Sequence, residues 1–116
     1  MRPPRIEHYS FGSVTIDGEV HTADVLILPN RVFAGWWRKS GHRLEAADIE
    51  DVLAVGPSCV VVGTGASGLM EVDPQLARLL ESRGARLIAE PTAEAVLTYN
   101  RLSGDGRTAA CLHLTC

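Results

Sequence analysis

The chain has 116 residues, of which 46% are hydrophobic and 22% charged, and its formal net charge is −3. This length suits one domain, and the composition is that of a folded globular protein rather than a disordered chain. A negative net charge argues against a general nucleic-acid binder, and no apolar run approaches the roughly 18 to 20 residues that a membrane span requires. These properties exclude a transporter, a secreted mini-protein and a multidomain enzyme.

The amino-terminal region and the cysteines indicate the expected compartment. The first seven residues, MRPPRIE, contain no apolar signal-peptide centre. Cys59, Cys111 and Cys116 are an odd number of cysteines without a CxxC pair, which is typical of a reducing environment. We therefore expect a cytoplasmic protein.

The first half of the chain predicts a β-hairpin followed by a buried strand. These three strands are expected at residues 11–16, 19–22 and 24–28. Asp17-Gly18 is a strong tight-turn signal between the two hairpin strands, and Pro29 ends the buried strand. Residues 31–43 have no clear period, so we expect a loop with short extended pieces there.

The second half predicts alternating helices and strands. Helices are expected to begin at Asp48, at Asp73-Pro74 and at Pro91-Thr92, and strands at residues 59–62, 86–89 and 108–115. Residues 59–62 are apolar and mostly β-branched, which is typical of a strand covered on both faces in a parallel sheet. This alternation predicts α/β layering, to which the hairpin adds an antiparallel element.

A glycine-rich turn follows the predicted central strand. Residues 63–68, GTGASG, match the GxGxxG pattern, and Glu90 stands where a dinucleotide fold would place its ribose-binding acid. The next helix signal comes only at Asp73-Pro74, so a tight turn is favoured over a dinucleotide site. Exposed amides of such a turn can bind a small anion, and the candidate ligand-binding residues are Gly63, Thr64, Gly65, Ser67 and Gly68.

Two further constellations lack a necessary partner. Cys111 and His113 share one face of the last predicted strand, but a metal site needs three or four ligands and no third is evident. Ser67, with His42 or His113 as base, would supply two parts of a hydrolase, yet nothing in their spacing brings them together. We therefore predict no catalytic residues, no metal and no cofactor, and favour a protein that is not an enzyme.

Residues 31–43 contain the most informative polar and aromatic cluster. Trp and Arg are the side chains that most often dominate protein interfaces, and the candidate partner-contact residues are Arg31, Trp36, Trp37, Arg38 and Arg43. Adjacent side chains of an extended segment face opposite ways, so we expect one tryptophan to point inward and one outward. Charge reversal at Arg38 is expected to weaken partner capture without lowering the melting temperature.

Several motifs, taken in order, carry a family resemblance: FGSVTIDG (11–18), DVLILP (24–29), WWRKSGH (36–42), DI (48–49), VVGTG (61–65), TAEAV (92–96), YN (99–100) and AACLHLTC (109–116). This joint pattern resembles the Mth938-like domain family, which includes small uncharacterised bacterial proteins, the adipogenesis-associated domain protein and a mitochondrial complex I assembly factor. The resemblance implies a single domain over residues 1–116 with a three-layer α/β fold, a central mixed sheet, flanking helices and an amino-terminal β-hairpin. It implies no established enzyme activity.

The leading hypothesis is a cytoplasmic binding or assembly protein that acts through a protein partner, without nucleic acid and without inserting into a membrane. Two alternatives stay open. One is a protein or enzyme that binds an anionic small molecule or a nucleotide at the Gly63–Gly68 turn. The other is a structural homo-oligomer, which needs only an exposed apolar patch or sheet edge.

Overall fold

The computed structural model describes residues 3–116. Its strands are β1 (Ile6–Ser10), β2 (Ser13–Ile16), β3 (Glu19–His21), β4 (Val25–Leu28), β5 (Arg31–Ala34), β6 (Arg43–Leu44), β7 (Cys59–Thr64), β8 (Glu71–Val72), β9 (Arg86–Glu90) and β10 (Thr108–His113). Its helices are α1 (Glu50–Val55), α2 (Pro74–Ser82) and α3 (Thr92–Leu102), with short 3-10 helices η1 (Ala46–Ile49) and η2 (Ser103–Asp105).

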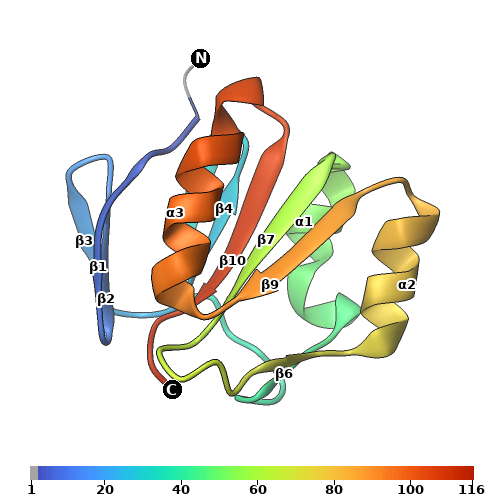
Figure 1. Cartoon of the computed structure of the whole chain (residues 1–116), viewed down its shortest axis with the longest axis horizontal. Coiled ribbons are helices and arrows are strands. Elements are labelled where there is room, and N and C mark those ends of the chain that lie inside the picture. Colours follow the sequence, from blue (N-terminus) through green and yellow to red (C-terminus); the bar gives the residue numbers. More distant parts are fainter. Residues whose placement is uncertain (1–2) are drawn as a thin grey trace.

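A five-stranded mixed sheet forms the centre of the molecule, in the order β5-β4-β10-β7-β9 (Figure 1). β7 runs parallel to both β10 and β9, whereas β4 runs antiparallel to β10 and β5. All six residues of β7 are buried, which confirms the prediction of a strand covered on both faces. The expected α/β class with a mixed central sheet is therefore correct.

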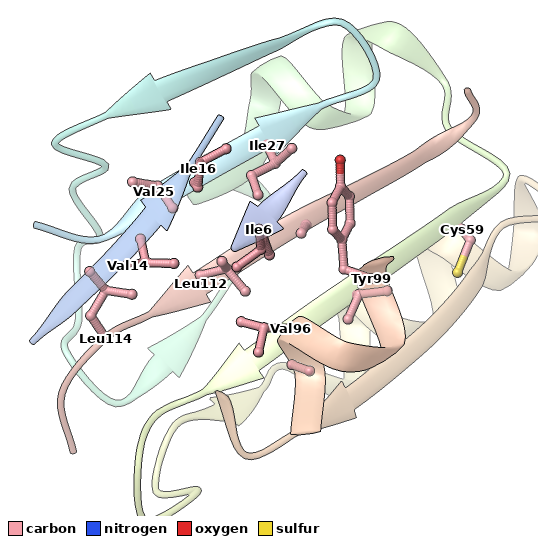
Figure 2. Close-up of a cluster of buried hydrophobic side chains, with 13 residues drawn as sticks. Ile6, Val14, Ile16, Val25, Ile27, Cys59, Val96, Tyr99, Leu112 and Leu114 are labelled. Carbon is pink, nitrogen blue, oxygen red and sulfur yellow. The ribbon is translucent and has the colours of Figure 1, made fainter. Parts of the chain in front are cut away.

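Each face of this sheet carries its own hydrophobic core. On one face, Tyr99 and Val96 of α3 pack with Val14 and Ile16 of β2 against Leu112 of β10 (Figure 2). On the other face, α1 and α2 contribute Val52, Leu76 and Leu80 to a second cluster with Val60 and Val62 of β7. The sheet is consequently the middle of three layers, as the resemblance implied.

Local sequence signals explain several element boundaries. Asp17 and Gly18 both have positive φ, 49° and 81°, as a two-residue hairpin turn between β2 and β3 requires. Asp73 caps α2 through its carboxylate, which accepts a hydrogen bond from the Gln75 N–H at 3.1 Å, and Pro74 occupies the first helical position. These predictions are confirmed.

The main differences from the sequence prediction concern β1, α1 and β10. Residues 6–10 form the unpredicted strand β1, which pairs with β2 and turns the hairpin into a three-stranded sheet. The expected helix at Asp48 starts as the 3-10 turn η1 before α1 begins at Glu50. β10 ends at His113 rather than Thr115, and the N–H of Leu114 donates to the Asp24 carboxylate at 2.8 Å.

Candidate functional site

The Arg38 side chain lies inside the protein, with only 5% of it exposed. Its Nη1 donates to Oδ2 of Asp24 at 2.7 Å, and its Nη2 donates to the carbonyl oxygen of Gly41 at 3.1 Å. The guanidinium also stacks on the Trp36 ring, 4.7 Å from its centroid. Arg38 is therefore placed to hold its own segment in position, and its contact with a partner stays a prediction.

Asp24, just before β4, is the acceptor at the centre of this arrangement. Its Oδ2 faces Arg38, and its Oδ1 accepts from the backbone N–H of Leu114. Burial by itself raises the pKa of Asp24, but hydrogen bonds from Leu114, His113 and Arg38 outweigh that effect and leave the pKa lowered. The carboxylate is thus charged at neutral pH and compensates the Arg38 guanidinium.

His113, the last residue of β10, completes the group that we name the Arg38 cluster: Arg38, Asp24 and His113. Its Nδ1 lies 2.8 Å from Asp24 Oδ2 and 3.0 Å from Arg38 Nη2. An ionised carboxylate can only accept, so we assign the proton of His113 to Nδ1, donating to Asp24. Among residues 3–116, His113 Nε2 and Arg38 Nε are the buried side-chain nitrogens that lack a hydrogen-bond partner.

An aspartate that orients a histidine is one part of a general-base arrangement, but such chemistry also needs a nucleophile within reach. Cys111 shares the strand face of His113, and burial raises the pKa of its thiol to about 12. A thiol with that pKa stays protonated and unreactive at neutral pH. The cluster consequently supports a positioning role better than a catalytic one.

The two tryptophans point in opposite directions, as predicted. Trp36 packs against the core cluster under α1 and α2, and its indole N–H donates to the carbonyl oxygen of Asp48 at 2.8 Å. Trp37 is 77% exposed, the highest value among the exposed large hydrophobic side chains of the described residues. The segment therefore presents one indole to solvent while the other anchors it.

The remaining predicted contact residues lie at the two ends of this region. Arg31, on β5, is exposed and stacks over the Phe33 ring at 4.5 Å from its centroid. Arg43, on β6, is half-exposed, and its Nη2 lies 3.2 Å from the Asp73 carboxylate. The five residues of the sequence prediction thus divide into two that point inward, Trp36 and Arg38, and three that are open to solvent to different degrees.

The glycine turn, residues 63–68, begins at the end of β7, where Gly63 and Thr64 pair with β10. The Gly65 N–H is bonded to the hydroxyl of Thr92 at 2.9 Å, and the Gly65 carbonyl accepts from the Thr92 N–H at 3.0 Å. Gly65 has φ +104°, and a Cβ there would lie 2.6 Å from the carbonyl oxygen of Cys116. A glycine is required here by packing within the chain itself.

Most amides of this turn are used internally. The Ala66 N–H donates to the carbonyl oxygen of Thr115 at 2.6 Å, and the Gly68 N–H donates to that of Gly65 at 3.2 Å. An anion site of this type depends on several backbone N–H groups that converge on open space. Because Gly65, Ala66 and Gly68 already have acceptors, exposed Ser67 is what remains of the predicted donor set.

The structure brings the two predicted regions to the same edge of the sheet. The Thr92 hydroxyl donates to the main-chain oxygen of His113 at 2.6 Å and accepts from the Gly65 N–H, while His113 Nδ1 and Arg38 Nη1 both donate to Oδ2 of Asp24. A continuous set of hydrogen bonds therefore connects the inward face of the tryptophan segment with the glycine turn. Sequence spacing gave no indication of this connection.

Asp24 and His113 are the residues that sequence reasoning missed as partners of Arg38. The sequence predicts only a strand position for Asp24, and only a metal pair or a base for His113. An available signal was that buried arginine and histidine side chains need acceptors, and Asp24 directly precedes an apolar strand. Which arginine it would meet depended on the tertiary fold.

Residues 3–116 also contain a cavity whose lining is separate from the Arg38 cluster. A cavity of about 560 Å³ lies between β1 and one face of α3, and its lining includes Tyr9, Leu97 and Asn100. No three His, Cys, Asp or Glu side chains in this part of the chain gather where they could hold a metal ion. No helix within it is long and apolar enough to span a bilayer.

Comparison with known proteins gives a family match over nearly the whole chain. The family model described as a protein of unknown function (DUF498/DUF598) matches residues 6–114. A conserved hypothetical protein from Pyrococcus horikoshii is 30% identical, with a TM-score of 0.82 over 97% of this chain and 99% of that chain. A Mth938-like domain protein from Bordetella pertussis is 18% identical and shares the fold, with a TM-score of 0.77 over 96% of this chain and 85% of that one.

One similar protein carries a functional name. It is the Xenopus tropicalis NADH dehydrogenase [ubiquinone] 1 alpha subcomplex assembly factor 3, which is 27% identical over 111 residues. The match covers 92% of this chain but only 59% of the relative. The chain therefore spans little more than half the length of that assembly factor.

Proposed function

Since the chain belongs to the DUF498/DUF598 family, the Mth938-like family that its motifs resemble, whose function is unknown, we propose that it is a non-enzymatic assembly-type protein that binds a protein partner through Trp37. The observation that carries this proposal is a 77% exposed indole held between two anchored neighbours. We name residues 36–41 the Trp37 segment.

The anchoring matters because an exposed side chain on a mobile loop loses entropy when it binds. On one side of Trp37, the backbone N–H of Trp36 donates to the Asp24 carbonyl oxygen at 2.8 Å. On the other side, Arg38 is bonded to Asp24 and Gly41. A tryptophan presented in a fixed geometry binds a partner at lower entropic cost, and tryptophan is among the most frequent interface hot spots.

Two other observations support this class of function. The Xenopus tropicalis relative is named as an assembly factor, and assembly factors act through protein partners. Cys59, Cys111 and Cys116 are free thiols in the structure, in keeping with the cytoplasm as the proposed compartment. The alternative of an anionic ligand at the glycine turn has weaker support, since internal acceptors occupy three of the turn's amides.

Site-specific photo-crosslinking in the native host tests the proposal. A photoreactive aromatic amino acid replaces Trp37 in one variant and Leu97 of α3 in the control, because Leu97 is also strongly exposed, at 69%. We expect position 37 to give a discrete crosslinked protein that position 97 does not give. The same crosslinks at both positions, or none at position 37, would contradict the proposal.

A folding control accompanies this experiment. The Trp37→Ala variant should keep the melting temperature of the wild type within the small range expected for exposed positions, about 0.5 kcal/mol in stability. Partner capture should be lost in the same variant. A large loss of stability would assign Trp37 to the fold rather than to an interface.

A further inference from the structure

We infer that the partner segment that meets Trp37 is acidic and carries an apolar side chain, and that Lys39 recognises its negative charge; this inference rests on the proposed function. The first observation is the alternation of exposure along the Trp37 segment. Trp36 and Arg38 are partly buried, whereas Trp37 and Lys39 are exposed. Trp37 and Lys39 are two positions apart in the chain, so the exposed indole and the exposed ammonium belong to the same short stretch of backbone.

The second observation is an uneven distribution of charge. Residues 31–43 carry four of the chain's 11 Lys and Arg residues and no Asp or Glu, although the whole chain has a net charge of −3. Within this region, Arg38 is compensated by Asp24 and Arg43 by Asp73. Among the described residues, Arg31 and Lys39 form no salt bridge within 4 Å.

The third observation is that the carboxylates of Asp48 and Asp24 accept hydrogen bonds from other groups of the chain. Asp48 lies close to Lys39, but its Oδ1 accepts from the Lys39 backbone N–H at 3.0 Å and its Oδ2 accepts from the Glu45 N–H at 2.9 Å. Both oxygens of Asp24 are likewise bonded. These carboxylates hold the backbone of the segment in place, and neither forms a salt bridge with the Lys39 ammonium.

These observations define the chemistry of the occupant. A protein segment would place an apolar side chain against the Trp37 indole and a carboxylate at Lys39, which combines an aromatic anchor with a charged rim. RNA and anionic membranes also attract lysine and tryptophan. A net negative protein whose free cations in this region are Arg31 and Lys39 is poorly suited to a polyanion, because such binding requires several cations on one face.

Selection from a random peptide display library on the immobilised full-length chain tests the inference. We expect the recovered peptides to carry a net negative charge and at least one large apolar residue. Synthetic copies should bind about tenfold more weakly to Lys39→Glu, and binding should weaken as salt rises from about 50 mM to about 300 mM. Arg101→Glu, which reverses an exposed charge on α3, is the matched control and should bind like the wild type.

The other outcomes separate the inference from the proposed function. Neutral or basic peptides that bind the wild type but not Trp37→Ala would overturn the acidic partner and leave the Trp37 contact standing. Peptides that bind independently of both Trp37 and Lys39 would overturn both. Vesicles that contain phosphatidylserine and single-stranded RNA are tested in parallel, and tighter Lys39-dependent binding to either would overturn the inference in favour of that ligand.

Discussion

Arg38 and Asp24 lie 14 positions apart in the sequence, and their side chains meet at 2.7 Å between Nη1 and Oδ2. Asp24 also accepts the backbone N–H of Trp36 through its own carbonyl oxygen. One residue therefore fixes the Trp37 segment through a main-chain bond and an ion pair. The Trp37 indole is held in its exposed position because its neighbours Trp36 and Arg38 are bonded to Asp24.

Replacing Arg38 with alanine should destabilise the fold. The substitution removes a buried ion pair and leaves the Asp24 carboxylate without the Arg38 guanidinium, at an expected cost of about 3 kcal/mol in the free energy of unfolding. Chemical denaturation measures this cost. Lys39→Ala, at the exposed neighbour, is the control and should change stability by no more than about 0.5 kcal/mol.

A double-mutant cycle with Asp24→Asn identifies the source of that cost. If the two side chains stabilise the fold through each other, the double variant should lose less than the sum of the single losses, with a coupling of about 1 to 3 kcal/mol. Additive losses would show that Arg38 stabilises the fold through Trp36 and Gly41 instead. Such a result would mean that the Asp24 carboxylate does not hold the Trp37 segment through Arg38.

The lowered pKa of Asp24 predicts a specific acid response. A carboxyl group whose pKa is lower in the folded state stabilises that state at pH values above its unfolded pKa, about 3.9. This stabilisation is lost as the pH falls from there through the folded pKa. The stability difference between wild type and Asp24→Asn should therefore be constant near neutral pH and shrink below about pH 4. Urea unfolding across this range measures it, and a difference that persists unchanged in acid would argue against the assignment.

Substitution of Gly65 should damage the fold rather than only a ligand site. Gly65→Ala would have to adopt φ +104° and bring a Cβ within 2.6 Å of the Cys116 carbonyl oxygen, at a cost of about 2 kcal/mol or more. Gly104→Ala is the matched control, because a Cβ there meets no atom within 4 Å. Thermal unfolding compares the two variants. Equal melting temperatures would mean that the backbone of residues 115–116 can shift away from the added Cβ with little loss of stability.

The three cysteines should differ sharply in reactivity. Cys116 is exposed, whereas Cys59 and Cys111 are buried, and burial raises the pKa of both buried thiols. An aromatic disulfide reagent should therefore modify one thiol per native chain quickly and the other two only after unfolding. Peptide mapping identifies the modified site. Rapid modification of Cys111 in the native protein would show that β10 opens easily.

Much of the architecture was accessible from the sequence because the signals are local. The apolar run in β7, the Asp17-Gly18 turn and the Asp73-Pro74 helix start each depend on residues within a few positions of one another. The opposite facing of Trp36 and Trp37 follows from the same local geometry. β1 was not predicted, since Ile6 is its only fully buried residue and the strand exists through its pairing with β2.

The sequence by itself thus determined most of the element types, the α/β class and the presence of an informative cluster at residues 31–43. Only the tertiary structure decided that Arg38 turns inward, because its acceptor Asp24 directly precedes β4 and its neighbour His113 ends β10; these strands are adjacent in the sheet, although the two residues are 89 positions apart in the chain. The same holds for the glycine turn, where Thr92 and Thr115 occupy amides that the motif leaves open. Periodicity and turn propensity act between near neighbours, whereas the pairing of a buried charge or a buried amide is decided by which strands the fold places side by side.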